Sequence, residues 1–248
     1  MSEEFISVEN VSRTFSGENA ITAIQDINFS IKKGEFLCIV GQSGCGKSTL
    51  LRIMAGIDPI HEGTVKINGN IVTKPDKTRG VVFQEARLLD WMSVKGNVAF
   101  PLQGMSKDEK NKLVEKYIGL VGLADFQKAY PRELSGGMAQ RVSIARALVN
   151  SPEVLFMDEP FGALDYMTKI NMQNELLRIR EKSQMTIIFV THDIDEAVYL
   201  SDKILVMSKY PGKVREIICN PLAIPRDRNS EAFFSIRKQV YDCFFINK

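Results

Sequence analysis

FLCIVGQSGCGKST, residues 36–49, places five consecutive apolar residues directly before a glycine-rich turn. The apolar run Phe36–Val40 is bounded by glycines and predicts a buried strand, and a helix is expected over Thr49–Ala55. Between the two, residues 41–48 fit the pattern G-x-x-x-x-G-K-[ST], which binds phosphate when it joins a strand to a helix. The stretch therefore predicts a nucleoside triphosphate site at the end of a buried strand.

Each residue type in this phosphate loop (residues 41–48) has a physical reason to be there. Glycines let the backbone curl so that its N–H groups point at an anion, and the start of the following helix adds a positive end. We expect Lys47 to reach the β and γ phosphates of ATP, and the Ser48 hydroxyl to bind Mg²⁺. The predicted nucleotide-binding set from this stretch is Gly41, Ser43, Gly44, Cys45, Gly46, Lys47, Ser48 and Thr49.

A second apolar run, Val154–Met157, ends in the two acids Asp158 and Glu159. A buried strand that ends in carboxylates places them at the edge of a parallel sheet where ligands bind. We expect Asp158 to hold Mg²⁺, and Glu159 to orient the attacking water or to accept its proton. Taken alone, these acids also fit a solvated turn after an ordinary strand, and the phosphate loop elsewhere in the chain favours the catalytic interpretation.

A third motif, LSGGMAQR at residues 134–141, predicts a second anion site. Ser135 is a good helix N-cap, and Gly136 and Gly137 leave the backbone amides of the first turn open. One fold rarely needs two such sites for one phosphate. The motif therefore predicts a dimer in which this signature turn (residues 135–137) closes on the nucleotide held by a second copy.

Strand-like and helix-like segments alternate along the chain, which predicts an α/β fold with a mainly parallel sheet. Residues 86–150 break the alternation, are rich in helix signals and suggest a helical lobe inserted into the sheet domain. The expected strands lie at residues 5–8, 21–31, 36–40, 65–71, 80–83, 154–157, 186–190, 203–207 and, as a hairpin partner, 213–218. The expected helices lie at residues 49–55, 106–121, 135–149, 163–182, 193–200 and 231–245, with Ser106 and Glu109 as a capping box.

Composition narrows the class of protein. The net charge of +2 gives no reason to expect a nucleic acid as partner, and no apolar run approaches the roughly 18 residues that span a bilayer. The acidic start of the chain does not look like a secretory signal. Four widely spaced cysteines argue against a disulfide framework and suit a reducing cytosol, and two histidines argue against a multi-histidine metal centre.

Together these motifs resemble the ATP-binding subunits of ABC transporters, from Phe15 to about residue 208. The resemblance implies a single domain over residues 1–248: a P-loop NTPase core with a mainly parallel sheet, an N-terminal antiparallel β subdomain and an inserted helical subdomain at about 86–150. It also implies four further site residues. Gln84 matches a loop glutamine that helps to bind Mg²⁺ and to position the reacting groups, and Asp165 lies in a loop that crosses the dimer interface. His192 matches a switch histidine that contacts the γ phosphate, and Phe15 matches an aromatic that stacks on adenine.

Within that family the chain looks closest to the importers of nitrate, sulfonates and taurine. The likeness lies in residues 83–91 (FQEARLLDW), 158–165 (DEPFGALD) and 191–197 (THDIDEA), while Asp90, Met138 and Tyr166 depart from common family patterns. It implies a homodimeric ATPase on the cytoplasmic face of the cell membrane that powers uptake of a small anion. Its implied partners are integral membrane permease subunits, contacted through Gln84–Trp91 and the helical lobe, and indirectly an extracytoplasmic substrate-binding protein.

Several alternatives stay open at this level. A soluble ABC ATPase without a transport role fits the same motifs, whereas a nucleotide kinase is disfavoured by the second anion turn. Taken singly, Gln84 fits an ordinary loop glutamine and His192 an ordinary strand-end histidine. Trp91, together with Leu88 and Leu89, suits core packing as well as a partner surface. The helix at 231–245 is expected to pack rather than to regulate, and Cys45 to fill space rather than to sense redox state.

Overall fold

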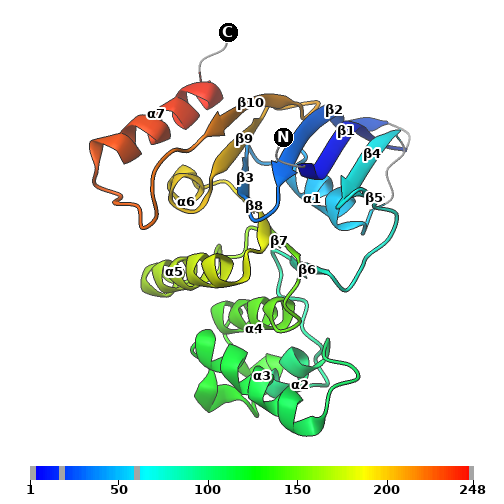
Figure 1. The fold of residues 1–248 in the computed structure, drawn as a ribbon, viewed down its shortest axis with the longest axis vertical. Helices are drawn as coiled ribbons and strands as arrows, with labels where there is room; N and C mark the ends of the chain where they lie inside the picture. Colours follow the sequence, from blue (N-terminus) through cyan, green and yellow to red (C-terminus); the bar gives the residue numbers. More distant parts are fainter. Residues whose placement is uncertain (1–3, 17–19, 59–61, 246–248) are drawn as a thin grey trace. The chain divides into compact units, whose positions relative to one another are not determined.

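The computed structural model describes residues 4–16, 20–58 and 62–245. The chain divides into two compact units, residues 1–76 with 186–248 and residues 77–185 (Figure 1). Along the sequence, the second unit lies between the two halves of the first. Among the described residues, no helix combines the length and apolar character needed to cross a membrane.

The first unit begins with an antiparallel sheet, as the family resemblance implies. Its strands, in the order β2-β1-β4-β5, are β1 (Glu4–Phe15), β2 (Ile21–Lys32), β4 (Glu62–Ile67) and β5 (Asn70–Ile71). The single strand expected at 65–71 is therefore wrong. Asn68 and Gly69 have φ values of 49° and 75°, and such an Asn-Gly pair reverses the chain into a tight hairpin.

A second, mainly parallel sheet of the first unit carries the buried strands. Its order is β10-β9-β3-β8, with β3 (Phe36–Val40), β8 (Thr186–Thr191), β9 (Lys203–Met207) and β10 (Val214–Cys219). The central strand β3 runs parallel to both of its neighbours, and β10 returns antiparallel to β9, as the predicted hairpin partner requires. Every residue of β3 and β8 is buried, which explains their continuous apolar sequence.

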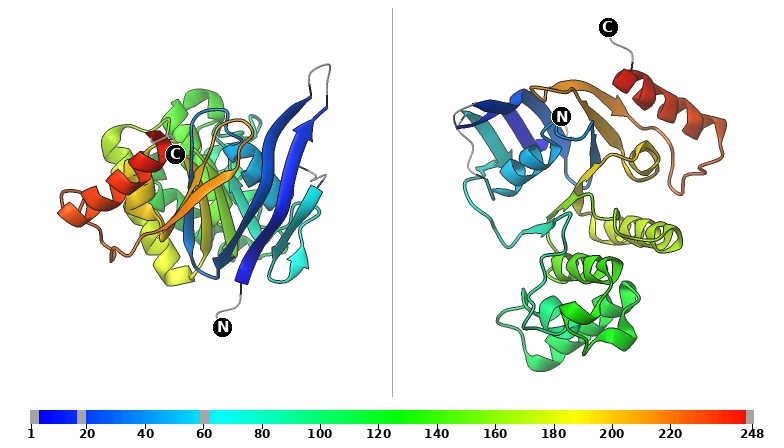
Figure 2. Two further views of the ribbon diagram at one scale, coloured as in Figure 1. Left: turned by 90° about the horizontal axis from the view of Figure 1, so that it is seen from above. Right: turned by 180° about the vertical axis from the view of Figure 1, so that it is seen from behind.

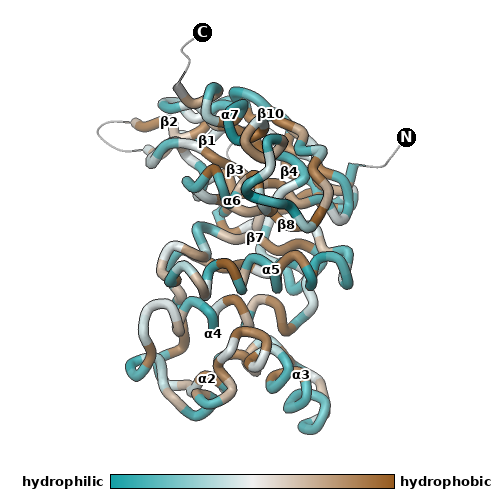
Figure 3. Tube along the Cα trace, turned by 90° about the vertical axis from the view of Figure 1, so that its left-hand side faces the viewer, coloured by the Kyte–Doolittle hydropathy of each residue, from teal (hydrophilic) through white to brown (hydrophobic). Residues whose placement is uncertain are grey.

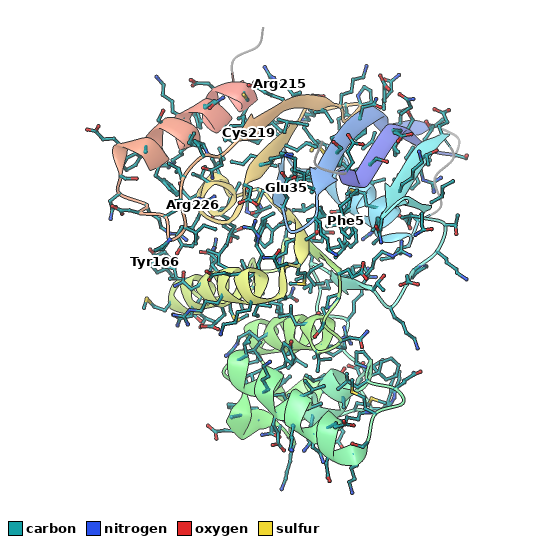
Figure 4. The ribbon with its side chains drawn as sticks, viewed as in Figure 1. Phe5, Glu35, Tyr166, Arg215, Cys219 and Arg226 are labelled. Carbon is teal, nitrogen blue, oxygen red and sulfur yellow. The ribbon has the colours of Figure 1, made fainter. Side chains whose placement is uncertain are left out.

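In the described part of the first unit the helices are α1 (Lys47–Ala55), α6 (Ile194–Leu200) and α7 (Glu231–Phe245), and Figure 2 shows them from two further directions. Helix α6 packs on β3 and β8, and α7 packs on α6, β9 and β10. Arg226, labelled in Figure 4, is buried and donates from Nη1 to the carbonyl of Tyr199 at 2.8 Å. This bond ties the segment before α7 to α6.

Among the described residues, the second unit combines two parallel strands with four α-helices and two short 3₁₀ helices, Ala124–Phe126 and Pro131–Glu133. Strand β6 (Arg79–Val82) pairs with β7 (Val154–Asp158), and the helices are α2 (Val94–Ala99), α3 (Lys107–Leu120), α4 (Gly136–Leu148) and α5 (Tyr166–Ser183). Helices α2, α3 and α4 pack against one another. In Figure 3 the inner strand β7 is drawn mostly in brown and the outer helix α3 largely in teal. The segment 86–150 lies wholly within this unit, which also contains both strands and α5.

Helix ends in this unit follow local sequence signals. The capping box predicted before α3 is present, because Ser106 Oγ accepts from the Glu109 amide and Glu109 Oε2 accepts from the Ser106 amide. The helix expected from residue 163 starts only at Tyr166 (Figure 4). Residues 159–164 form tight turns instead, in which Gly162 N–H donates to Glu159 O and Leu164 N–H donates to Phe161 O.

Candidate functional site

The phosphate loop joins β3 to α1, the strand-to-helix context that its sequence predicts. Gly44 and Gly46 have φ values of 79° and 93°, a left-handed conformation that favours glycine. Lys47 is only 5% exposed, and its Nζ donates to the carbonyl of Gly41 at 2.8 Å and to that of Gln42 at 3.1 Å. The ammonium group therefore lies within the loop, where an anion bound to the loop amides would meet it.

Two glycines of the loop are also required by space. A Cβ atom at position 41 would lie 2.5 Å from the Cys45 sulfur, and one at position 46 would lie 2.4 Å from Ile24 Cγ2. Cys45 itself is buried, and burial raises the pKa of its thiol. Cys45 thus fills space under the loop as the neutral thiol, in agreement with its sequence-based interpretation.

A turn between β9 and β10 lies against the phosphate loop, which the sequence analysis missed. Gly212 N–H donates to Ala23 O at 3.0 Å, and Gln25 N–H donates to Gly212 O at 2.9 Å. A Cβ atom at Gly212 would lie 2.0 Å from the carbonyl oxygen of Cys45. In the sequence the Pro211-Gly212 pair indicates only a hairpin turn, because the residues of β2 and the loop that it contacts are remote in sequence.

Strand register places His192 beside the phosphate loop. Val40, the last residue of β3, pairs with Thr191, the last residue of β8. Because the strands are parallel, Gly41 and His192 leave the sheet at the same edge. His192 is exposed there, whereas Thr191 is 2% exposed.

Phe15 lies at the end of β1 in the first unit and is 42% exposed. The guanidinium carbon of Arg13 lies 4.6 Å from the centre of its ring. Such a contact between a cation and an aromatic face holds the ring in place. The first unit therefore contains Phe15, the phosphate loop and His192.

The second unit brings the glutamine loop and the acidic strand end together. Val82, the last residue of β6, pairs with Met157, so Phe83-Gln84 and Asp158-Glu159 emerge at one edge. Asp158 is 3% exposed, and Gln84 is exposed. Glu159 has a φ of 44°, an unusual conformation for a residue with a side chain and one that clusters at functional sites.

The signature turn and the loop around Asp165 are also neighbours within the second unit. Ser135 caps α4 as predicted, since its Oγ accepts from the Met138 amide at 3.2 Å. A Cβ atom at Gly137 would lie 2.9 Å from the carbonyl oxygen of Ala163, whereas one at the exposed Gly136 would meet nothing within 4 Å. Asp165 caps α5 through the Thr168 amide at 3.0 Å, and this hydrogen bond lowers the pKa of its carboxyl group.

Side chains of α4 hold the residues on both sides of Gln84. Gln140 is buried and donates from Nε2 to the carbonyl of Phe83 at 2.9 Å, and Arg146 donates from Nη2 to the carbonyl of Ala86 at 3.1 Å. The motif analysis found Gln140 in the signature but assigned it no role. Nothing local in the sequence links it to a loop more than fifty residues away.

Buried Asn97 holds the rest of this loop. Its Oδ1 accepts from the Leu89 amide at 2.8 Å, and its Nδ2 donates to the carbonyls of Leu89, Met92 and Ser93. Trp91 lies between these anchors and is 73% exposed. The core-packing alternative for Trp91 is therefore wrong for this chain by itself, and its indole is available to a partner.

Comparison with known proteins supports the chemistry of these motifs. Residues 24–162 match the ABC transporter family. The chain is 49% identical over 240 residues to the aliphatic sulfonates import ATP-binding protein SsuB of Bacillus cereus, covering 96% of this chain and 95% of that protein. It is 47% identical over 219 residues to the nitrate import ATP-binding protein NrtD of Synechocystis sp., covering 87% of this chain and 82% of that protein.

The fold of the chain also matches that of a solved ATP-binding cassette. The ATP-binding cassette MJ0796, in a dimeric post-hydrolysis state bound to ADP and Pi, matches with a TM-score of 0.81 and 33% identity. The match covers 88% of this chain and 100% of that one. On its motifs, its fold and these matches, the chain belongs to the ABC transporter family of ATP-binding proteins.

Proposed function

We propose that this ABC transporter ATPase powers the import of a small anion, with nitrate, a sulfonate or taurine as the candidate substrates. The observation that carries the proposal is the buried Lys47 within a glycine loop whose neighbouring strand ends at Thr191, directly before His192. The names of the sulfonate and nitrate import relatives support the choice of substrate class. They also favour a transport role over that of a soluble ATPase.

In this function the first unit binds ATP. The amides of residues 43–49 and the Lys47 ammonium hold the phosphates, because the loop presents hydrogen-bond donors and a positive charge to the anion. Phe15 stacks on adenine through its exposed ring. Lys47 exchanges its two carbonyl partners in the loop for phosphate oxygens, which are stronger charge-assisted acceptors.

Hydrolysis follows from positioning and electrostatics. Glu159 orients a water molecule and accepts its proton as the water oxygen attacks the γ phosphorus and the bond to the β-phosphate oxygen breaks, giving ADP and Pi. His192 and Gln84 position the reacting groups. In a dimer, Ser135, Gly136 and Gly137 of one copy complete the γ-phosphate site of the other, with Asp165 at the interface, and the dimeric state of the MJ0796 cassette supports this arrangement.

The residues available for Mg²⁺ fit a hard cation. Ser48, Gln84 and Asp158 offer oxygen donors with a single carboxylate, the kind of set Mg²⁺ uses when phosphates and waters supply its remaining ligands. No cluster of three or more His, Cys, Asp or Glu side chains suited to a metal occurs in the described part of the chain. When bound, Mg²⁺ would neutralise charge on the phosphates.

The second unit offers a surface for a permease subunit. Trp91 and Phe100 are exposed on it, and a groove of about 270 Å³ has Phe100, Arg79 and Arg146 among its lining residues. Exposed aromatic side chains are typical anchors of protein interfaces, and arginine is also enriched there. We propose that the protein acts at the cytoplasmic face of the membrane, as a peripheral homodimer on permease subunits that receive substrate from an extracytoplasmic binding protein.

Reconstitution tests the proposal. The tagged chain should co-purify from mild detergent with an integral membrane protein, and ATPase activity of this complex in proteoliposomes should rise when its loaded substrate-binding protein is added. Nitrate, taurine and an alkanesulfonate are compared, with Lys47→Ala as the inactive control. Absence of any membrane protein would leave a soluble ATPase, and a complex stimulated by none of the three anions would contradict the substrate class.

A further inference from the structure

Both neighbours of His192 are held by hydrogen bonds to the first turn of α6. Thr191 Oγ1 donates to Glu196 Oε2 at 2.5 Å and accepts from the Asp193 amide at 3.0 Å. Asp193 Oδ1 in turn accepts from the amides of Asp195 and Glu196 at 2.9 and 3.3 Å. We call Thr191, Asp193 and Glu196 the histidine clamp, because their bonds enclose the one residue between Thr191 and Asp193.

The clamp differs from an ordinary capping box. In a capping box, the acidic side chain at the third helical position bonds back to the amide of the N-cap residue. Here Thr191 Oγ1 takes that amide, and Glu196, which occupies the third position, reaches the Thr191 hydroxyl instead. Asp193 already satisfies the helix amides, so the bond from Thr191 to Glu196 is not needed to start the helix.

Burial separates the clamp from the residue it holds. Thr191 and Glu196 are 2% and 4% exposed, while His192 is exposed. A carboxylate is costly to bury unless hydrogen bonds compensate it. The bond from Thr191 provides such compensation for the buried carboxylate of Glu196. Helix α6, which carries Glu196, is itself held in place, because it packs on β3 and β8 and Arg226 donates to the Tyr199 carbonyl at 2.8 Å.

We propose that Thr191 and Glu196 are positioning residues for His192, fixing the backbone on both sides of the imidazole so that it projects from the sheet edge toward the γ phosphate. This inference rests on the proposed function, in which His192 contacts that phosphate. The physical gain is pre-organisation: a loop fixed before ATP arrives loses no conformational entropy when the reacting groups are aligned. Neither residue touches the nucleotide.

Two threonines at opposite ends of β8 provide a matched test. Thr186 is also buried, and its hydroxyl also accepts from a backbone amide, that of Gly34 at 2.9 Å. Thr191→Val removes the clamp hydroxyl, Thr191→Ser keeps it, and Thr186→Val makes the same change at the far end of the strand. For each variant, kcat for ATP hydrolysis, the Kd for ATP and the thermal midpoint are measured.

We expect Thr191→Val to lower kcat about tenfold or more, with the Kd for ATP unchanged within about twofold. Thr191→Ser should restore most of the activity, and Thr186→Val should keep it. A Thr191→Val enzyme with normal kcat would overturn the inference, as would a loss that Thr191→Ser does not rescue or that Thr186→Val shares. If Thr191→Val does not fold, Glu196→Gln, which keeps an acceptor, is compared with Glu196→Met, which has none, and equal activity in that pair would overturn the inference.

His192→Ala separates this inference from the function on which it rests. If His192→Ala retains normal kcat, the proposed role of the histidine fails, whatever the clamp does. If His192→Ala is inactive while Thr191→Val is normal, the clamp alone fails. With both ideas correct, adding Thr191→Val to His192→Ala lowers kcat no further, because the clamp acts only through the imidazole.

Discussion

The side-chain amide of Gln140 donates a 2.9 Å hydrogen bond to the backbone carbonyl of Phe83, the residue directly before Gln84. The helix that begins with the signature turn is thereby connected to the loop that carries the candidate Mg²⁺ ligand. Arg146, six residues further along the same helix, makes a second connection, to the carbonyl of Ala86. A displacement of the loop would therefore move α4, and the signature turn with it.

Gln140→Met should uncouple this helix from the loop. The substitution keeps the side-chain length and leaves the Phe83 carbonyl without its donor, which costs about 1–3 kcal/mol of stability. We expect a lower kcat with retained ATP affinity, because the phosphate loop belongs to the other unit. Gln173→Met is the control, since Gln173 is a buried glutamine of α5 in the same unit. If both variants lose stability and keep full kcat, the contact is only structural.

Glu159→Gln should trap a dimer bound to ATP. The amide has nearly the shape of the carboxylate but accepts no proton from water, so ATP is bound and not cleaved. We expect light scattering after gel filtration to show twice the monomer mass in the presence of ATP. Glu153→Gln, at an exposed glutamate just before the same strand, should behave as the unchanged protein. Normal turnover by Glu159→Gln would remove the role assigned to this residue.

Gly212→Ala should disturb the phosphate loop through the turn between β9 and β10 that lies against it. The added methyl group would overlap the Cys45 carbonyl, 2.0 Å away, and overpacking of this kind costs about 1–3 kcal/mol. We expect a lower thermal midpoint together with weaker ATP binding, measured by calorimetry. Gly119→Ala in α3 is the opposite case, because nothing lies within 4 Å of its added methyl group, and it should gain about 0.5–1 kcal/mol. An unaltered Kd for ATP in Gly212→Ala would show that the loop tolerates displacement of this turn.

Asp165 should stabilise the fold in a pH-dependent manner. Its hydrogen bond from the Thr168 amide lowers the pKa of the carboxyl group in the folded state. The unfolded state therefore takes up this proton first as the pH falls, and the stabilisation, complete near neutral pH, is lost below about pH 4 as the pH passes through the lowered pKa. Denaturant titrations should show Asp165→Ala destabilised at pH 7 and much less so at pH 3. Asp165→Asn, which keeps a capping oxygen, should lose less, and a pH-independent difference for Asp165→Ala would contradict this account.

The features predicted correctly from the sequence are those whose causes are local. The strand before the phosphate loop, the glycines of the loop and the capping box at Ser106 each depend on residues only a few positions apart. The predicted N-cap at Ser135 is confirmed for the same reason. Two predictions are wrong for reasons that are also local. The single strand at 65–71 ignores the turn signal of Asn68-Gly69, and the helix at 163–182 includes Asp165, which instead caps the helix.

The missed features depend on pairs far apart in the chain. Gln140 with Phe83, and Gly212 with Cys45, meet only because of the tertiary fold. The clamp combines both kinds of cause: Asp193 is a readable cap, yet Glu196 in the same motif was not assigned a partner. A glutamate at the third helical position usually accepts from the N-cap amide, whereas here Glu196 accepts from the buried Thr191 hydroxyl at the strand end.

Asn97 makes four hydrogen bonds to residues 89–93, so the backbone that carries the exposed indole of Trp91 is held in place by the chain itself. A partner protein that binds at this surface therefore meets a preformed loop. A partner whose shape does not match that loop is rejected when the two proteins first meet. Because the loop is already ordered, binding loses little affinity to the entropy cost of ordering it. The complex can therefore be both selective and fast to form.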